Sequence, residues 1–469
     1  EPVTPYNQIR LKFEGEESYG NWADSGIVKG SCEITAFQVR TGKKQNAAFA
    51  LGEKKIIFIL DHGVPELSLI PEEPHKNDYY NKDFTVDIEA WDMLEGSVHS
   101  GIARVEYQVV CGSSLEDMEN NRTQNGILYQ GEEGKKGIEK YSKDAYESYQ
   151  PIIIDSNVNN SDFVRLSVTV TDWSGNFVTK TEDFKINTTI PKVKVEMSGT
   201  ANKEAKDGFY TSRTATITVT DRASTFDPQA ILEGLEIAAK NFEGDEVIIN
   251  KTAMLSEWEV KDGEGQEHSY TSTLDFGTDA NYQWSLHYEN KAGNRVDGIE
   301  NGNTMIETVG EHVWGFTVDT KAPKEEKTSI TLETSVWNKL LSALTFGVFA
   351  NYSVSALAVS TDDISPIEAE DIKYYKSNEY RALTATELEE LYTSGEFSQD
   401  VISVDSDEAF VIYARIMDAA GNVLYVSTDG VVVDLTEALV ELTQGEANQN
   451  GFYNSDVEFG IFVNEKIVT

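Results

Sequence analysis

The feature that most constrains the fold of this chain is a strand-turn-strand segment that occurs three times. The clearest copy, AFVIYARIMDAAGNVLYVSTDGVVVD, runs over residues 409–434. Residues 164–187 repeat it as VRLSVTVTDWSGNFVTKTEDFKIN, and residues 282–319 begin YQWSLHYENKAGNRVDG and end WGFTVD. Before each turn, apolar residues occupy every second position, which is typical of a strand with one face on a core and one in water. Because a slip of one residue would turn the apolar set outward, the shared register predicts a shared fold.

The turns themselves share the pattern D/N-x-x-G-N. Asp or Asn at the first position can accept a hydrogen bond from the backbone two residues on. The glycine suits a residue with positive φ, as in a type I turn closed by a bulge. The predicted structural turn residues are Asp172, Gly175 and Asn176, then Asn290, Gly293 and Asn294, and finally Asp418, Gly421 and Asn422. Three such turns between β-patterned segments indicate a repeated hairpin.

A second repeated marker is a strand that ends in Asp or Asn before a short link, which contains Pro in most copies. The aligned positions are Asp61, Asn187, Asp319 and Asp434. Pro suits such a link because it cannot continue a central strand and stiffens the connection. The markers divide the 469 residues into a partial or atypical β module (1–61), complete modules at 62–188, 189–320 and 321–435, and the truncated start of a further module (436–469).

The pattern of short strands separated by turn signals, with no long alternation of strands and helices, predicts an all-β fold. We expect tandem Greek-key β-sandwich modules in an elongated array. Short helical turns belong in the connections. Asp227 followed by Pro228 predicts one of them, and the capping-box sequence of residues 384–387 predicts another.

Charge and cysteine content exclude several classes of function. The 39 basic and 80 acidic residues give a formal net charge of −41, which repels phosphate backbones and anionic lipid headgroups. Nucleic acid is therefore not an expected partner. The only cysteines, Cys32 and Cys111, exclude a disulfide framework and a Cys-ligated zinc site. Cys111 is in phase with apolar strand residues, so a buried free thiol is expected, with a Cys32–Cys111 bridge as the alternative.

One uncharged stretch, residues 340–361, is long enough to span a bilayer. Asn351, Tyr352 and several serines interrupt it. We therefore expect no membrane span, but a short helix at 335–344 followed by a strand at 352–360. The sequence begins at Glu1 and stops among β-patterned residues. We interpret it as an internal piece of a longer protein, with any signal peptide and anchor outside it.

The turn and boundary motifs resemble those of the bacterial immunoglobulin-like repeats of large secreted or wall-anchored proteins. The resemblance rests on D-x-x-G-N at 172–176 and 418–422, on its Asn290 variant, and on FTVDTKAP at 316–323. It is clearest over 62–435, and residues 1–60 and the insertions depart from it. It implies immunoglobulin-like sandwich modules strung along a bacterial cell surface as stalks, spacers or adhesive arms. The family has no shared catalytic motif, and some members bind host glycoproteins, glycans or immunoglobulins through loops of their own.

No catalytic or established metal-binding motif is present. The six histidines form no H-E-x-x-H pair, and no nucleophile elbow or phosphate-binding loop occurs. No cofactor is therefore expected, with calcium as the alternative. Oxygen ligands for calcium are offered by Asp362 and Asp363, by residues 405–408, and by the boundary residues Asp61, Asp319 and Asp434. Calcium needs roughly six to eight such oxygens and no EF-hand loop is present, so turn capping and solvation explain these residues as well.

A polar insertion at residues 112–150 contains the most distinctive candidate binding surface. Tyr141, Tyr146 and Tyr149 cluster in the sequence YSKDAYESY. Tyrosines in a loop can supply rigid contact area for a partner. The alternative is that they pack the insertion against its own sandwich.

Together these observations predict a non-enzymatic protein of a bacterial cell surface, extracellular and attached through an anchor outside this segment. It would act as an adhesive or spacer stalk. The alternative is a dedicated host-binding protein, for example immunoglobulin-binding, whose contacts come from the loop insertions. Its partner would be a host glycoprotein, a glycan or an immunoglobulin.

Overall fold

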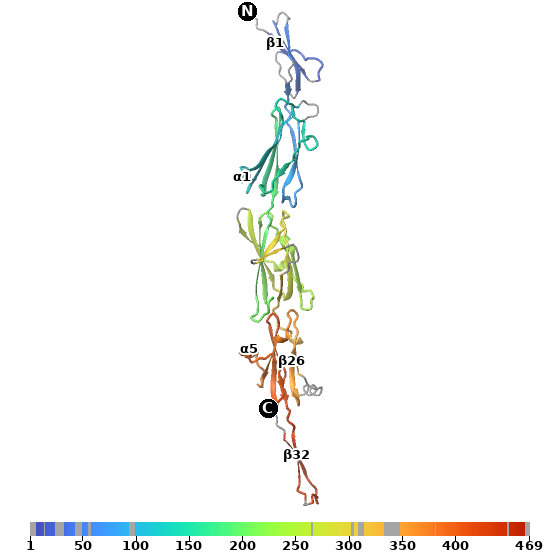
Figure 1. The fold of residues 1–469 in the computed structure, drawn as a ribbon, viewed down its shortest axis with the longest axis vertical. Coiled ribbons are helices and arrows are strands. Elements are labelled where there is room, and N and C mark those ends of the chain that lie inside the picture. The colour runs from blue at the N-terminus through green and yellow to red at the C-terminus, as the bar shows by residue number, and fades with distance from the viewer. Residues whose placement is uncertain are drawn as a thin grey trace.

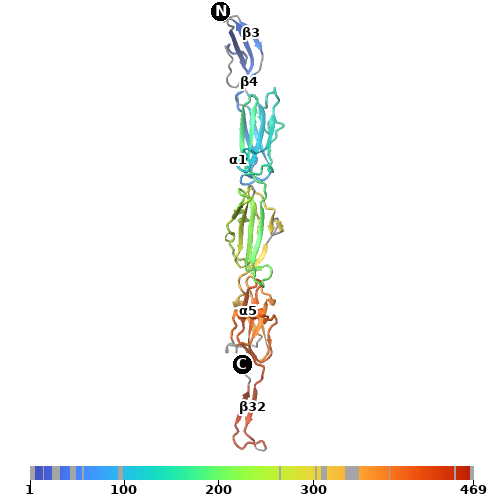
Figure 2. The same ribbon diagram turned by 90° about the vertical axis from the view of Figure 1, so that its left-hand side faces the viewer.

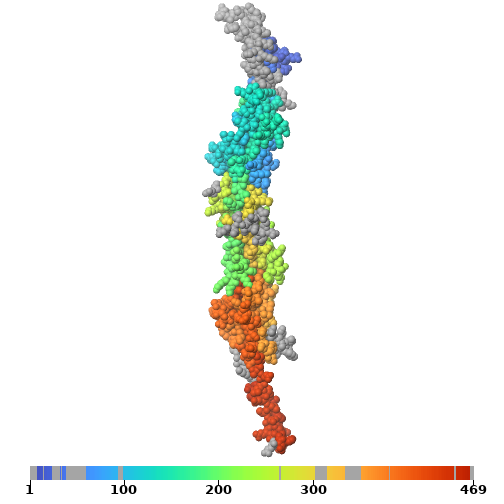
Figure 3. All heavy atoms as spheres, in the orientation of Figure 1, coloured from blue at the N-terminus to red at the C-terminus, as the bar shows by residue number. Residues whose placement is uncertain are grey.

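The computed structural model describes residues 6–13, 15–23, 32–42, 49–54, 58–92, 99–263, 266–301, 304–307, 314–332, 348–379, 381–447 and 450–464. These residues form a rod of β modules placed end to end (Figure 1). The rod stays narrow when it is turned by 90° (Figure 2), and the coloured atoms of the three complete modules follow one another along its length in Figure 3. The all-β prediction of tandem sandwich modules is therefore confirmed.

An N-terminal unit and a C-terminal hairpin lie at the two ends of the rod (Figure 1). The N-terminal unit is one antiparallel sheet of β1 (Tyr6–Phe13), β2 (Cys32–Gly42), β3 (Phe49–Lys54) and β4 (Phe58–Leu60). The C-terminal hairpin pairs β32 (Leu439–Gln444) with β33 (Phe459–Asn464).

Module one is a sandwich of two sheets. One sheet contains β5 (Glu66–Pro71), β7 (Phe84–Trp91), β10 (Lys140–Tyr141) and β11 (Ile152–Ile154). The other has the order β6 (Tyr79–Tyr80), β13 (Phe177–Ile186), β12 (Phe163–Asp172), β8 (Ile102–Gly112) and β9 (Arg122–Gln130), with α1 (Leu115–Met118) between β8 and β9. Part of the 112–150 insertion therefore extends the second sheet as β9.

Module two repeats the sandwich with longer connections. One sheet has the order β18 (Glu259–Asp262), β19 (Glu267–Phe276), β16 (Ser212–Arg222), β14 (Lys192–Thr200), β21 (Gly298–Asn301) and β22 (Thr304–Glu307). The other has β15 (Phe209–Tyr210), β23 (Trp314–Val318), β20 (Ala280–Leu286) and β17 (Leu235–Lys240). The connections carry α2 (Pro228–Gly234), which Asp227 caps as predicted, and α3 (Lys251–Met254).

Module three is built in the same way. One sheet has β24 (Ser329–Leu332), β26 (Val354–Val359) and β28 (Ser403–Val404). The other has β25 (Val348–Ala350), β31 (Val431–Val433), β29 (Glu408–Met417), β27 (Ile372–Ser377) and β30 (Val423–Ser427). The helices are η1 (Glu325–Lys327), η2 (Ala369–Asp371) and α5 (Ala385–Ser394), and α5 begins with the predicted capping box.

Each complete module encloses its own apolar core. In β12 the burial alternates residue by residue as predicted, and Leu166 and Val168 are fully buried. In β29 the prediction of one water-facing side is wrong, because Tyr413, Arg415 and Met417 are buried as well as the core-facing residues. Leu388 of α5 and its neighbours cover that second face.

The middle copy of the repeated segment also departs from a simple hairpin. β12 pairs with β13, and β29 pairs with β30, across their turns. After the turn in module two, however, the chain leaves β20 and enters β21, which pairs in parallel with β14 of the opposite sheet. The turn is thus repeated three times, but the long hairpin only twice.

The remaining predictions have mixed outcomes. Both cysteines are free and Cys111 is buried, as expected. The strand expected at 352–360 is β26, whereas the helix expected at 335–344 lies outside the described residues. Among the helices that the structure describes, none is long and apolar enough to cross a membrane.

Candidate functional sites at the module junctions

The D/N-x-x-G-N turns all lie at one end of their modules, where the preceding module or unit ends. Their glycines have the positive φ that the pattern predicts: 88° at Gly175, 83° at Gly293 and 77° at Gly421. The first residue of each turn forms two hydrogen bonds with the backbone of the last residue. The backbone N–H of the first residue donates to the carbonyl oxygen of the last residue at 3.0–3.1 Å. The side-chain Oδ1 of the first residue accepts from the backbone N–H of the last residue at 2.8 Å, 3.0 Å and 2.9 Å in the three turns.

The last Asn of each turn reaches back to the preceding module or unit. Its Nδ2 donates to a backbone carbonyl there, at 3.3 Å from Asn176 to Asp61, 2.8 Å from Asn294 to Asn187 and 3.3 Å from Asn422 to Asp319. The acceptors are the boundary residues that the sequence aligned. Each turn is therefore a clamp between consecutive modules as well as a bend within one.

The boundary residues also share an Asx turn. Each side-chain Oδ1 accepts from the backbone N–H two residues on, at 2.8 Å for Asp61, 2.9 Å for Asn187 and 3.1 Å for Asp319 and Asp434. This Asx turn fixes the direction in which the chain leaves the module. The N–H groups of Asn187, Asp319 and Asp434 also donate to carbonyls of β6, β15 and β25 at 2.9 Å, so each complete module ends in the same register.

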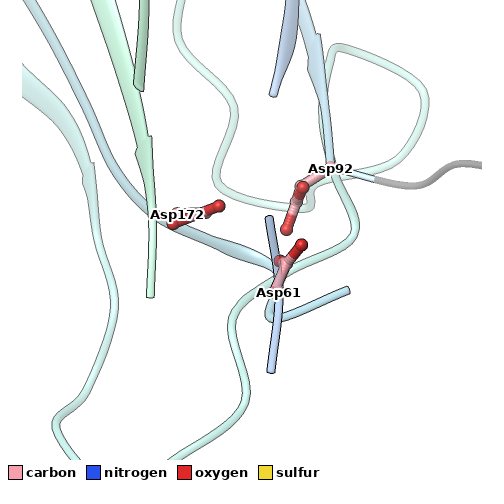
Figure 4. Close-up of side chains that lie close together, drawn as sticks. All are labelled: Asp61, Asp92 and Asp172. Atoms are coloured by element: carbon pink, nitrogen blue, oxygen red, sulfur yellow. The ribbon is translucent and has the colours of Figure 1, made fainter. Parts of the chain in front are cut away.

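A third acidic position completes each junction; of its three residues, the sequence had pointed only to Asp362, as a possible calcium ligand. Asp92 follows β7, Asp221 lies in β16, and Asp362 follows β26. At the first junction, carboxylate oxygens of Asp61, Asp92 and Asp172 lie within 4.8 Å of one another. Asp61 and Asp92 point toward each other, and Asp172 points toward them from the end of β12 (Figure 4). Asp319, Asp362 and Asp418 form the same arrangement at the third junction.

Burial dominates the electrostatics of the first triad. Its three residues are at most 7% exposed. Backbone N–H groups of Ser100 and Gly101 donate to Asp61 and Asp92 at 2.7 Å and 2.6 Å. Burial raises the pKa of Asp92 and of Asp172, and the charge of Asp61 raises both pKa values further.

The third triad is perturbed more strongly. Burial raises the pKa of Asp319 to about 6 and that of Asp418 to about 7, and the charge of Asp362 adds to both shifts. The Ser365 hydroxyl is near enough to oppose the shift at Asp319. Even so, neither this hydroxyl nor Asp319 Oδ2 has a partner at hydrogen-bond geometry.

The second junction replaces two of the three carboxylates with amides. Asn187 and Asn290 occupy the boundary and turn positions, and Asp221 keeps the third position; all three are fully buried. Asn290 Nδ2 donates to Asp221 at 3.2 Å, and the Thr225 hydroxyl donates to the same carboxylate at 3.0 Å. Asn187 Nδ2 donates to the Thr225 hydroxyl at 2.9 Å. This junction is a closed hydrogen-bond network around one carboxylate.

Further polar contacts cross the second junction. The buried guanidinium of Arg222 donates to the carbonyl of Ile186 at 2.8 Å and to Asn160 Oδ1 at 2.8 Å, both in module one. Lys76 of module one forms an ion pair with Glu289 of module two at 2.7 Å. Because Arg222 is only 6% exposed, its bonds are shielded from water and hold the two modules firmly.

The third junction has a different cationic contact. Arg415 of module three bonds Glu204 of module two at 2.6 Å and lies 3.8 Å from the ring centre of Tyr392. The Tyr392 hydroxyl donates to the same Glu204 carboxylate at 2.7 Å. Arg415 is one of the β29 residues that the alternating pattern had predicted to face water. Its burial follows from the contact with Glu204 and from the cover that α5 provides.

The tyrosines of the insertion pack against module one and take no part in either carboxylate triad. Tyr141 is fully buried in the core of module one, and Tyr146 and Tyr149 are partly buried against it. The Tyr149 hydroxyl donates to Asp87 at 2.9 Å and accepts from the N–H of Ile88. Tyr141 therefore has no surface to offer a partner, and a binding role for Tyr146 and Tyr149 stays a prediction.

The calcium candidates fall into two groups. Asp61, Asp319 and Asp362 join the triads, whereas Asp434 belongs to neither triad found in the described residues. Asp363 pairs with Lys324, and Asp407 caps the chain after module three by accepting from the N–H of Leu435. Asp172 and Asp418 were assigned to turns alone. Aligning the ends of β7, β16 and β26, the third strand of each sandwich, would have added Asp92 to them.

No protein-family model and no curated protein matches the chain. A solved structure of a tetra-tandem repeat in the extending region of a large adhesion protein is similar with a TM-score of 0.34 and 13% identity, covering 93% of this chain and 94% of that one. A structure of a 1.5-MDa bacterial ice-binding adhesin has a TM-score of 0.25 and 12% identity, covering 80% and 100%. A Salmonella alpha-2-macroglobulin mutant has a TM-score of 0.19 and 10% identity, covering 94% and 38%. All three likenesses are distant.

The clamp predicts that Gly421 is less tolerant of substitution than Gly175. Both have positive φ, so an Ala costs about 1–2 kcal/mol of backbone strain at either position. A Cβ at Gly421 would also lie 2.8 Å from Cβ of Asn202 in module two, whereas a Cβ at Gly175 meets nothing within 4 Å. Denaturant unfolding should therefore show a larger loss of stability for Gly421→Ala than for Gly175→Ala, by about 1 kcal/mol or more. Equal losses of stability in the two variants would mean that a side chain at position 421 does not collide with module two.

The third triad predicts a pH dependence when a chelator keeps cations away. The folded pKa values of about 6 and about 7 lie above the ordinary value of 3.8. The unfolded chain therefore releases these protons first, and the triad's contribution to stability falls as the pH rises from about 4 to 7. Asp319→Asn/Asp418→Asn removes both groups. Relative to wild type, its free energy of unfolding should rise by about 1–3 kcal/mol between pH 5 and pH 8. A constant difference would contradict the raised pKa values.

Proposed function

We propose that this chain is a non-enzymatic extender: a stiff spacer that carries other parts of a bacterial cell-surface protein away from the cell. The observation that supports this most directly is the repeated clamp. Each turn Asn bonds the end of the preceding module or unit, and the buried arginines Arg222 and Arg415 bond across the second and third junctions. Clamped junctions limit rotation between modules, which a freely jointed chain of domains would retain.

The net charge of the chain is consistent with this role. With a formal net charge of −41, neighbouring rods repel one another and stay soluble. The cell-surface location comes from the resemblance of the turn and boundary motifs to bacterial immunoglobulin-like repeats. It remains part of the proposal, as does the absence of enzymatic activity.

The alternative, a dedicated binder of a host glycoprotein, glycan or immunoglobulin, depended on the insertion of module one. That insertion is tied to its own sandwich through β9 and through the buried Tyr141. The packing leaves the binding proposal without a specific structural observation in its favour, so we rank it second.

Two measurements on the intact chain test the proposal. Small-angle scattering should give the pair-distance distribution of a rod with a narrow cross-section, and a compact particle would end the extender proposal. Capture experiments with the immobilised chain and host secretions should recover no specific protein. A saturable partner that is lost after Tyr146→Ala/Tyr149→Ala would instead support the binding alternative.

A further inference from the structure

Two buried arginines lie at the ends of modules two and three that face the preceding module. Arg222 of module two is 6% exposed, and Arg415 of module three is 2% exposed. An arginine guanidinium does not lose its proton in proteins, so a buried one depends on acceptors that the protein supplies. Removing one partner of a buried charge leaves that charge uncompensated and is strongly destabilising. The stability of each module therefore depends on where its arginine finds acceptors.

The guanidinium of Arg222 finds its acceptors in module one. It donates to Asp162 Oδ1 at 3.2 Å, to the carbonyl of Ile186 at 2.8 Å, and to Asn160 twice, at 3.1 Å on the carbonyl and at 2.8 Å on Oδ1. Asp162 also forms its ion pair. Within the described residues, none of the hydrogen bonds that this guanidinium donates stays inside module two.

Arg415 is arranged in a similar way at the third junction. Its hydrogen bond to a carboxylate goes to Glu204 of module two, at 2.6 Å. Inside module three, the guanidinium contacts the ring of Tyr392 and lies 3.7 Å from Sδ of Met417. Glu389 of module three is 3.9 Å away and forms no hydrogen bond with it, so Nε has no hydrogen-bond partner. Among the described residues, Glu204 is therefore the only carboxylate that hydrogen-bonds this buried cation.

The loop that carries Glu204 is itself held on module three. On one side of Glu204, Asn202 Nδ2 donates to the carbonyl of Ala420 at 2.9 Å. On the other side, the backbone N–H of Lys206 donates to the carbonyl of Ala419 at 2.8 Å. Both acceptors belong to the D/N-x-x-G-N turn of module three. These two bonds fix the carboxylate beside the guanidinium, so little ordering is needed to form the ion pair.

Neither arginine belongs to the repeated pattern of the modules. In the order of the modules, the residues that follow the third acidic position are Met93, Arg222 and Asp363. The residues three positions before the turn are Thr169, His287 and Arg415. Each buried arginine is thus specific to its own junction, unlike the turn Asn that all three junctions share.

From this arrangement we infer that consecutive modules stabilise each other through these arginines, so that module two is coupled to module one and module three to module two. The face around each arginine fits a partner that offers carboxylate and carbonyl oxygens, and the preceding module is that partner. The stability of the rod is then a sum of module and interface contributions, as in repeat proteins, and the modules do not unfold independently. This coupling goes beyond the extender proposal, because it holds for a rod of any function.

The third junction allows a test in which the substitution and its effect lie in different modules. Glu204→Gln, in module two, leaves Arg415 buried without its carboxylate. Glu204→Gln/Arg415→Met removes the buried charge as well, so that no unpaired cation remains. Glu236→Gln removes an exposed carboxylate of β17, also in module two, and is the matched control. Circular dichroism reports whether each variant is folded.

Hydrogen–deuterium exchange with mass spectrometry on the intact chain reports the stability of each module separately. In Glu204→Gln, the amide hydrogens of β29 in module three should exchange about tenfold faster than in wild type, or more. Because coupling is reciprocal, exchange in β19 of module two should also rise, whereas β12 of module one should keep its rate. The double variant should bring the β29 rate back to within about threefold of wild type, and the control should change no rate.

Asp162→Asn tests the second junction in the same way. This substitution in module one should accelerate exchange in β16 of module two and leave β29 of module three unchanged. The acceleration should be smaller than in Glu204→Gln, because Arg222 keeps the oxygens of Asn160 and Ile186 as acceptors.

Three results would overturn the inference. They are unchanged exchange in module three of folded Glu204→Gln, equal acceleration in module one of that variant, and a double variant that exchanges as fast as Glu204→Gln. Small-angle scattering from the same samples keeps the outcome apart from the extender proposal, because a rod whose modules unfold independently is still a rod.

Discussion

The structure depends on one hydrogen bond, from the last Asn of each D/N-x-x-G-N turn to the backbone of the module or unit before it. The same five residues bend the chain within a sandwich and fix it to its neighbour. In the first and third turns the same Asn Nδ2 also donates to the carboxylate of the turn's own Asp, at 2.7 Å and 3.0 Å, so the last Asn serves both the turn and the clamp. Because the acceptor is the boundary residue, turn and boundary recur together.

The junctions share this clamp, but they differ in how the carboxylates around it are compensated. The second junction buries one carboxylate among amide and hydroxyl donors and adds Arg222 as a bridge. The third brings together two buried carboxylates, Asp319 and Asp418, with the half-buried Asp362, and places Arg415 to one side, on Glu204. Burying like charges together is unfavourable unless a proton or a cation compensates them. The stiffness of the rod should therefore vary along its length with the solution conditions.

Much of the fold could be predicted from the sequence, because strand alternation and turn glycines are local signals. The register of β12 and the positive φ of Gly421 follow from such patterns. The burial of Arg415 could not be predicted, because the cover comes from α5 and the partner Glu204 lies 211 residues away. The path of the chain from β20 into β21 was missed for a similar reason: the choice of sheet is made by tertiary pairing. Two of the three positions of each triad, the boundary and the turn, could be aligned from the sequence, but the third position was not aligned with them.

The central claim is that the turn Asn fixes one module against the next, and a distance measurement across the second junction tests it most directly. Spin labels at exposed Lys180→Cys in β13 and Glu236→Cys in β17, in a chain with Cys32 and Cys111 replaced by Ser, report on modules one and two. Pulsed electron resonance should give one narrow distance distribution, and Asn294→Ala, which removes only the clamp donor, should broaden it. A wild-type distribution as broad as that of the variant would contradict the account.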